Sequence, residues 1–264
     1  MLFLLCCCGT AFSADLYGVV RSPAPVLNIP AAGLPHPDSC GQVRELEFIA
    51  LPGTALAIRE TVTRGGVTLF RFETAEYPSS APLYIDSRHV TLRPTTPPAR
   101  TPVLPVRSRV TELLEKAIGV PYVWGGNVQA GIRAPGGDGA PLFAGLDCSG
   151  LLYQATGGWT PRNTSSLVGF GTPVGITGKS ALEIVAALRP LDLIVWYGHV
   201  VIVLDRERAI ESRLECGRPG SGGVTVTPLL QRLREVMRTR HPADAWGSRP
   251  RGQKLFVVRR WIPE

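Results

Sequence analysis

The stretch Asp147–Leu152 (DCSGLL) places a cysteine at the start of an apolar helical stripe that continues to Ala155. Asp147 is a favourable N-cap residue, and two glycines after the stripe provide a stop, so we expect a helix that begins at Cys148. Unpaired N–H groups and the helix dipole stabilise a thiolate at this position. The stretch therefore predicts a cysteine nucleophile.

A nucleophilic cysteine needs a base within hydrogen-bond reach, and the chain has four histidines. His199 begins an apolar strand that runs to Leu204, from which its imidazole can be aimed at Cys148. If the strand turns back as a hairpin, Glu211 returns beside His199 and fixes its tautomer, as the third member of a triad does. Each residue also has a structural interpretation: Cys148 as a core residue, His199 as a structural histidine, and Glu211 as a solvated or ion-paired glutamate.

Residues 94–105 contain five prolines and predict an extended linker between two domains. Before it, 67–74 alternates, with Phe70 and Phe72 on one face, and 83–85 and 90–92 indicate further short strands. No helical period is evident there, so we expect a small β-barrel.

After the linker, the periodicity becomes helical. Ser108 is expected to cap one helix, and Ser180 with Glu183 forms a capping box at another. The segments 191–196 and 200–204 then indicate two strands joined by a tight turn. Helices followed by antiparallel strands predict an α+β domain.

Residues 1–14 carry an apolar run too short to cross a bilayer, followed by small residues, as expected of an export signal. A lipoprotein signal is less favoured, because no small residue directly precedes Cys6, and a buried first strand is the structural alternative. Without this segment three cysteines remain, so at least one thiol is unpaired within the chain. A disulfide between Cys40 and Cys216 is compatible with export, but the sequence leaves it open.

The 264 residues are 44% hydrophobic, which excludes global disorder. Most of the net charge of +7 lies in residues 228–264, where we expect a solvated basic face. No aromatic residues alternate with these charges, so the pattern does not indicate nucleic-acid binding.

Five motifs occur in an order that resembles the NlpC-type cell-wall cysteine peptidases, over roughly 109–212. They are Pro121–Gly126 (PYVWGG), Asp147–Leu151 (DCSGL), Pro161-Arg162, Pro190–Leu193 (PLDL) and Gly198–Val200 (GHV). The resemblance implies an α+β, papain-like catalytic domain at 108–264, preceded by a linker at 94–107, an SH3-like β-barrel at 15–93 and the signal at 1–14.

The resemblance also implies roles for individual residues. Cys148 is the nucleophile, His199 the general base, and Glu211 takes a position that is commonly a second histidine. The resemblance places four residues in substrate binding: Tyr122, Asp147, Ser149 and Arg162. Tyr122 would also help to bind the oxyanion. The glycine-rich stretch 127–146 is either a cleft lid or a passive insertion.

These residues predict an exported cysteine endopeptidase that cleaves the γ-D-glutamyl–diamino acid bond of peptidoglycan stem peptides or muropeptides. We expect a monomer with no metal or organic cofactor and no membrane span. The amino-terminal domain would close one end of the cleft, and Asp147 would pair with the ammonium of a free L-Ala or merely cap the helix. The alternatives are an N-acetylmuramoyl-L-alanine amidase and a non-catalytic wall-binding protein.

Overall fold

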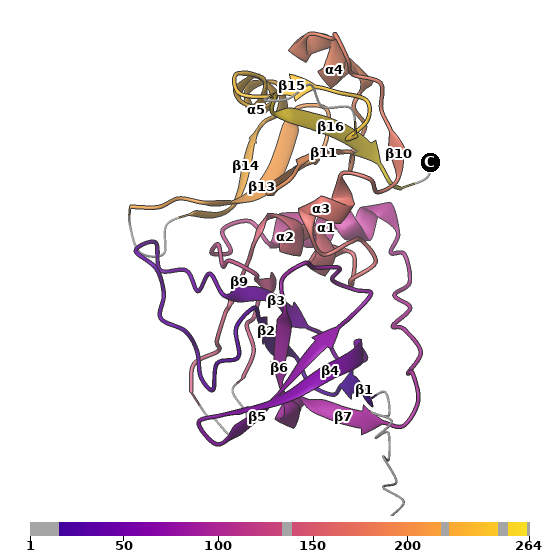
Figure 1. Ribbon diagram of the computed structural model, residues 1–264. Coiled ribbons are helices and arrows are strands. Elements are labelled where there is room, and N and C mark those ends of the chain that lie inside the picture. Colours follow the sequence, from indigo (N-terminus) through magenta and orange to yellow (C-terminus); the bar gives the residue numbers. More distant parts are fainter. Residues whose placement is uncertain (1–15, 134–138, 218–221, 248–252, 263–264) are drawn as a thin grey trace, which may run out of the picture.

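The computed structural model describes residues 16–133, 139–217, 222–247 and 253–262, so the predicted export signal lies outside the described residues. Two antiparallel sheets dominate the fold, and helices α1 to α3 lie between them (Figure 1). Within the described ranges, no helix is long and apolar enough to cross a membrane.

The amino-terminal sheet has the strand order β3-β2-β6-β5-β4-β1-β7. Phe70 and Phe72 of β5 are buried, whereas Arg71 and Glu73 are exposed, which confirms the predicted alternation. The strands are β1 (Leu16–Val20), β2 (Ala24–Leu27), β3 (Leu46–Ala50), β4 (Ala55–Arg64), β5 (Val67–Glu73), β6 (Leu83–Asp86) and β7 (Val90–Arg93), with a short 3-10 turn at Ser87–His89.

The expected closed barrel is wrong for this sheet. Among the described residues, its pairing is an open path from β3 to β7, and no ladder joins these two strands. The Asn127 side chain occupies the edge of β3 instead: it accepts from the Ile49 N–H at 2.8 Å and donates to the Ile49 carbonyl at 3.0 Å. The edge strand is therefore bonded to the carboxyl-terminal half of the chain.

The proline-rich segment has no regular structure from residue 94 to 106, but it is anchored midway. Arg100 donates to Glu76 at 2.9 Å and to the Tyr153 hydroxyl at 2.6 Å. Helix α1 (Arg107–Lys116) begins after Val106, which makes no side-chain cap. The expected Ser108 cap is wrong because the helix starts one residue before Ser108.

The carboxyl-terminal sheet has the order β10-β16-β11-β12-β13-β14, and β15 pairs with β16. Its strands are β10 (Thr172–Pro173), β11 (Leu193–Trp196), β12 (His199–Val203), β13 (Arg208–Leu214), β14 (Gly222–Pro228), β15 (His241–Pro242) and β16 (Leu255–Arg260). The helices are α2 (Cys148–Ala155), α3 (Thr164–Leu167), α4 (Ala181–Ala187) and α5 (Leu229–Met237). The mixed architecture with antiparallel sheets agrees with the predicted α+β class.

Both faces of this sheet are covered. Val195 and Ile202 pack with residues of α1 and α2, while Ile194 and Val201 pack with residues of α4 and α5. The central strands are therefore continuously apolar, as expected for strands buried on both faces. The capping box of Ser180 and Glu183 at the start of α4 is confirmed.

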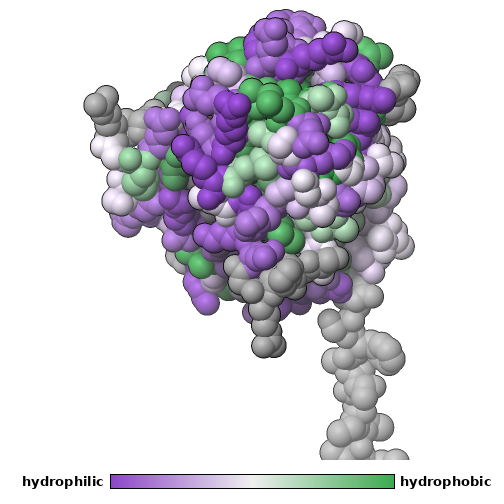
Figure 2. Space-filling view, turned by 90° about the horizontal axis from the view of Figure 1, so that it is seen from above, coloured by the Kyte–Doolittle hydropathy of each residue, from purple (hydrophilic) through white to green (hydrophobic). Residues whose placement is uncertain are grey.

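The basic carboxyl-terminal segment is not a purely solvated face. Arg259 donates to the carbonyl groups of residues 169–171, and Arg260 pairs with Asp192 at 2.6 Å. Seen from above, hydrophilic residues surround smaller apolar areas (Figure 2). Part of the positive charge in 228–264 thus serves the fold.

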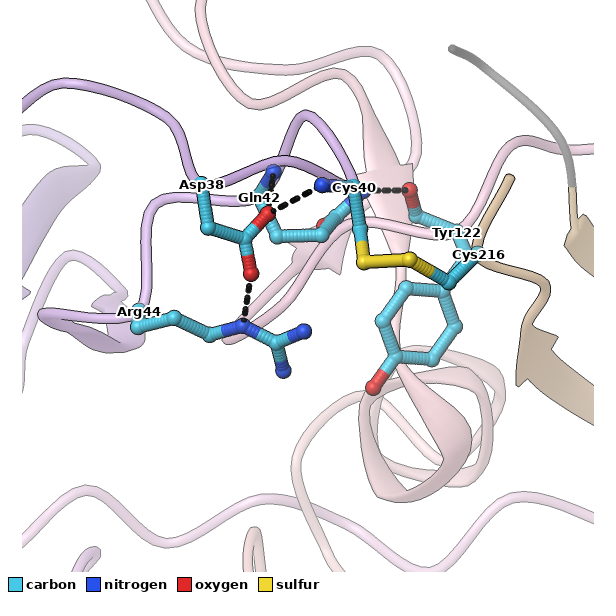
Figure 3. Close-up of a disulfide and its surroundings, with 6 residues drawn as sticks. All are labelled: Asp38, Cys40, Gln42, Arg44, Tyr122 and Cys216. Atoms are coloured by element: carbon cyan, nitrogen blue, oxygen red, sulfur yellow. Dashed lines mark hydrogen bonds and ion pairs between the residues drawn. A yellow bond between two sulfur atoms is a disulfide. The ribbon is translucent and has the colours of Figure 1, made fainter. Parts of the chain in front are cut away.

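Cys40 and Cys216 form a disulfide whose Cα atoms are 5.0 Å apart (Figure 3). The bond joins the loop before β3 to the segment after β13, across a sequence separation of 176 residues. Cys148 is buried and unpaired in the described part of the chain. The Cys40–Cys216 pairing, which the sequence left open, is therefore present, and it leaves the thiol of the candidate nucleophile Cys148 free.

Removal of the disulfide is expected to destabilise the protein by about 2–4 kcal/mol, because the unfolded chain loses a constraint over a long loop. Urea unfolding of Cys40→Ser, Cys216→Ser and the double variant measures this change in the free energy of unfolding. The double variant should be no less stable than the weaker single variant, since one bond is lost in each case. Additive losses would contradict this explanation.

Candidate active site

Cys148 is the first residue of α2 and is 6% exposed. Asp147 caps the helix by accepting from the Gly150 N–H at 2.6 Å, so the predicted helix start is confirmed. Gly150 is required by packing, because a Cβ at this position would lie 1.9 Å from the Gly126 carbonyl oxygen. The helix N-terminus thus approaches the preceding loop closely and directs its dipole at the thiol.

His199 and Glu211 are brought together by two successive hairpins. Trp196 pairs with His199 across the turn between β11 and β12, and β13 returns antiparallel to β12. The His199 Nε2 lies 2.6 Å from Glu211 Oε2, with Glu211 completely buried. Because Nε2 is engaged by Glu211, Nδ1 is the ring nitrogen left for an interaction with Cys148, whose charge acts on the imidazole.

Arg232 of α5 completes this chain of charges, and no local sequence pattern points to it. Its guanidinium contacts both Glu211 oxygens, with Nε 2.5 Å from Oε1 and Nη2 2.8 Å from Oε2. Arg213, the nearer residue in sequence, is farther away, at 3.8 Å. Burial alone would raise the pKa of Glu211, but hydrogen bonds from His199 and Arg232 lower it, so the carboxylate stays ionised.

The imidazole of His199 is held in its protonated form. Burial by itself lowers the pKa of His199, but the negative charge and hydrogen bond of Cys148, followed by those of Glu211, raise it to about 9. At neutral pH this arrangement favours an imidazolium hydrogen-bonded to the ionised Glu211 carboxylate. Such an imidazolium is suited to proton delivery to a leaving group.

Arg162, predicted to bind substrate, lies 2% exposed beneath the nucleophile. It donates to Asp147 at 2.7 Å, to Ser149 at 2.9 Å and to Asn127 at 3.2 Å. The Asp147 charge is therefore balanced within the protein. The alternative helix-capping role of Asp147 is present, and its pairing with a substrate ammonium stays a prediction.

A cleft of about 130 Å³ lies over Cys148. Four residues predicted to bind substrate line it together with the nucleophile: Tyr122, Asp147, Ser149 and Arg162. Burial, reinforced by the negative charges of Asp147 and Cys148, raises the pKa of Tyr122 well above its ordinary value. The Tyr122 hydroxyl thus remains protonated and can donate a hydrogen bond to an oxyanion.

Two lining residues, Glu47 and Tyr77, come from the amino-terminal sheet and its β5–β6 connection. Glu47 accepts from the Tyr77 hydroxyl at 2.8 Å and from the Asn28 amide at 2.8 Å. Sequence reasoning missed both, because no local pattern distinguishes them from other residues of short strands.

The stretch 127–146 is closed at its base by the pairing of β8 (Asn127–Val128) with β9 (Gly145–Leu146). A further bridge joins Ile132 and Leu142, and residues 134–138 lie outside the described ranges. The two predicted roles of this stretch, a cleft lid and a passive insertion, both stay predictions. In the described ranges, no three His, Cys, Asp or Glu side chains are grouped so as to hold a metal ion.

No protein family profile matches the chain, and no curated protein does. Similar solved structures include an NlpC/P60 family protein from Bacillus cereus, with 15% identity and a TM-score of 0.37 over 95% of this chain and 64% of that one. The peptidoglycan hydrolase RipB from Mycobacterium tuberculosis has 25% identity and a TM-score of 0.36, over 60% and 65% of the two chains. The chain therefore spans less than two thirds of either protein.

The non-catalytic NlpC/p60 domain protein RipD from Mycobacterium tuberculosis, described as adapted to a peptidoglycan-binding function, is also similar. It has 21% identity and a TM-score of 0.35, over 60% of this chain and 98% of that one. The similar structures thus include both a hydrolase and a non-catalytic protein.

Glu211→Gln is expected to lower the pKa of the His199 imidazole by about 1 or more, because a neutral acceptor replaces the buried carboxylate. An NMR titration of the ring protons measures it directly. Glu235→Gln is the matched control, since Glu235 pairs with Arg232 at 3.2 Å and has no contact with the imidazole. An unchanged His199 titration in Glu211→Gln would show that the carboxylate does not govern the imidazolium.

Proposed function

We propose that the chain is a peptidoglycan stem-peptide hydrolase, a cysteine endopeptidase that cleaves the γ-D-glutamyl–diamino acid bond. The observation that carries this proposal is the hydrogen bond between His199 and Glu211, together with Cys148 at a helix start in the lining of a cleft and its charge acting on the His199 imidazole. A thiol at a helix start, a histidine and a carboxylate that orients it are the parts required for acyl transfer.

In the proposed reaction, the Cys148 thiolate attacks the γ-glutamyl carbonyl carbon. The resulting oxyanion accepts hydrogen bonds from the Tyr122 hydroxyl and the Cys148 backbone N–H. The His199 imidazolium gives its proton to the departing amine as the carbon–nitrogen bond breaks, which leaves a thioester. His199, now neutral, takes a proton from water as the oxygen attacks the thioester, and the carbon–sulfur bond breaks to release the acid and restore the thiolate and the imidazolium.

Glu211 acts through His199 by fixing its tautomer and stabilising the imidazolium. Arg232 in turn holds Glu211 ionised and immobile, since both carboxylate oxygens are engaged. Arg232 is thus a positioning residue in this proposal, and Glu211 is not the base.

The amino-terminal sheet supports a preference for a free amino-terminal L-Ala. Asp147 and Ser149 line the acyl side of the cleft, but Arg162 already neutralises Asp147. Glu47 lines the same cleft without a cationic partner among the described residues. An ammonium seated there would be paired with Glu47, whereas an acylated nitrogen would leave this carboxylate without a cation.

The alternatives differ in what they require of this cleft. An amidase would have to admit the sugar-linked lactyl group where Glu47 and Tyr77 lie. A wall-binding protein would not need the His199–Glu211 contact. We further propose that the chain is exported, acts as a monomer, and has its domains at 15–93 and 108–264, with a papain-like second domain.

Cys148→Ala and His199→Ala are expected to lower hydrolysis of L-Ala-γ-D-Glu-diamino acid tripeptide by at least about 10⁴-fold without altering the fold. Product formation followed by liquid chromatography measures the rate, and circular dichroism checks the fold. Cys40→Ala is the control and should retain turnover apart from its loss of stability. Cleavage by Cys148→Ala at the wild-type rate would exclude this nucleophile.

The tripeptide with a free amine is expected to be cleaved at least about tenfold more efficiently than its N-acetylated form, because only the free amine gives Glu47 a cation. Glu47→Gln should reduce this preference in kcat/KM. The change of the same preference in Asp147→Asn measures how much Asp147 contributes to recognition of the amine. Equal cleavage of the acetylated peptide and intact sacculi would indicate an open cleft and a wall-cutting enzyme.

A further inference from the structure

A loop before β3 is organised around one carboxylate at the edge of the cleft. Asp38 Oδ1 accepts the Cys40 N–H at 2.8 Å and the Gln42 N–H at 2.9 Å, while Oδ2 accepts Arg44 Nε at 2.6 Å. Hydrogen bonds from Gln42 and Arg44 lower the pKa of Asp38. The loop is therefore preorganised, and the Cys40–Cys216 disulfide ties its tip to the catalytic half of the chain.

The same loop fixes the side of the cleft that carries Trp124. The Gln42 side chain accepts the Trp124 N–H at 2.8 Å, and the Arg44 guanidinium lies over the indole, 4.6 Å from the ring centroid. Trp124 lines the cleft and is 38% exposed. Cation–π stacking and the Asp38 pair thus hold the Arg44 guanidinium in one orientation.

Arg44 keeps most of its donors for another partner. Its Nε serves Asp38, but the four N–H groups on Nη1 and Nη2 make no hydrogen bond to any described residue. Arg44 and the Tyr122 ring extend to the same side of the disulfide (Figure 3), and the Arg44 charge acts on the Tyr122 hydroxyl. A fixed, partly exposed guanidinium with unused donors therefore lies against Trp124, a residue of the cleft lining.

We propose that Arg44, stacked on Trp124, is a subsite for a carboxylate of the substrate. A planar guanidinium held at one edge presents its two remaining nitrogens as a fork, which matches the two oxygens of a carboxylate. Asp38 orients this fork without covering it. No bond forms or breaks at this subsite, which serves recognition only.

This inference rests on the proposed function in taking the ligand to be a stem peptide. In such a peptide the γ-linked D-glutamate keeps a free α-carboxylate, and the diamino acid carries a carboxylate of its own. Both present the chemistry that Arg44 recognises. Amidation of one group at a time separates the two sources.

The test compares three tripeptides: the free acid, the D-glutamyl α-amide and the amide of the diamino acid carboxylate. Wild-type protein should favour the free acid over one of the amides by about tenfold or more in kcat/KM. Arg44→Met should remove this preference by weakening cleavage of the acid while leaving kcat nearly unchanged. Arg44→Lys, which keeps the charge but lacks the fork, should retain part of it.

Arg71→Met is the matched control, because Arg71 is an exposed arginine of the amino-terminal sheet and pairs with Glu60 at 3.6 Å. It should keep the wild-type preference. Retention of that preference in Arg44→Met, or an equal loss for all three peptides, would overturn the subsite.

Calorimetric binding of the same peptides to Cys148→Ala separates this inference from the proposed function. If wild-type protein cleaves none of them, but Cys148→Ala binds the acid more tightly and Arg44→Met abolishes the difference, the hydrolase proposal fails and the subsite stands. If hydrolysis occurs without any dependence on Arg44, the hydrolase stands and the subsite fails.

Discussion

The burial of the Arg162 guanidinium is the constraint on which the arrangement around Cys148 depends. A buried charge without partners costs several kcal/mol, so every group near it must be an acceptor in the correct place. Asp147, Ser149 and Asn127 supply those acceptors. Because Asp147 also caps α2, the ion pair that stabilises Arg162 fixes the first turn of the helix that carries the nucleophile.

The same guanidinium couples the two sheets through Asn127. The Asn127 side-chain oxygen Oδ1 accepts hydrogen bonds from the Arg162 guanidinium and from the Ile49 N–H. The side-chain nitrogen Nδ2 of Asn127 donates to the Ile49 backbone carbonyl. One side chain thereby satisfies a buried cation and the open edge of β3. This accounts for an amino-terminal sheet that does not close on itself: its edge strand is already bonded to the catalytic half.

A second, partly buried cation, Arg232, has a different consequence for the surroundings of Cys148. Arg232 neutralises Glu211 as Arg162 neutralises Asp147, but Glu211 also touches the titratable imidazole of His199 and helps to raise its pKa to about 9. The first pair is therefore static, whereas the second sets the protonation of His199. The Arg162–Asp147 pair thus fixes the position of Cys148, and the Arg232–Glu211 pair influences the protonation of the neighbouring imidazole.

Sequence reasoning succeeded where the information is local. The cap of α2, the capping box of α4 and the return of Glu211 beside His199 follow from spacings of three to twelve residues. It failed where distant segments meet: nothing near Arg232 distinguishes it from the other basic residues of its helix, and nothing in β3 shows that Asn127 will occupy its edge. Such contacts depend on topology, which periodicity does not encode.

The division of labour between the sheets follows from these long-range contacts. Cys148, His199 and Glu211 belong to the carboxyl-terminal part. From the amino-terminal part, Glu47 and Tyr77 line the cleft, and Arg44 stacks on Trp124 of its lining. Three tethers hold the two parts in register: the Cys40–Cys216 bond, the Asn127–Ile49 hydrogen bonds and the Arg100 contacts with Glu76 and Tyr153. None of these tethers touches the imidazole or the thiol. In the proposed reaction, a disturbance of one tether would displace Glu47, Tyr77 and Arg44 relative to an intact Cys148, and would therefore weaken substrate binding before it weakened the chemical step.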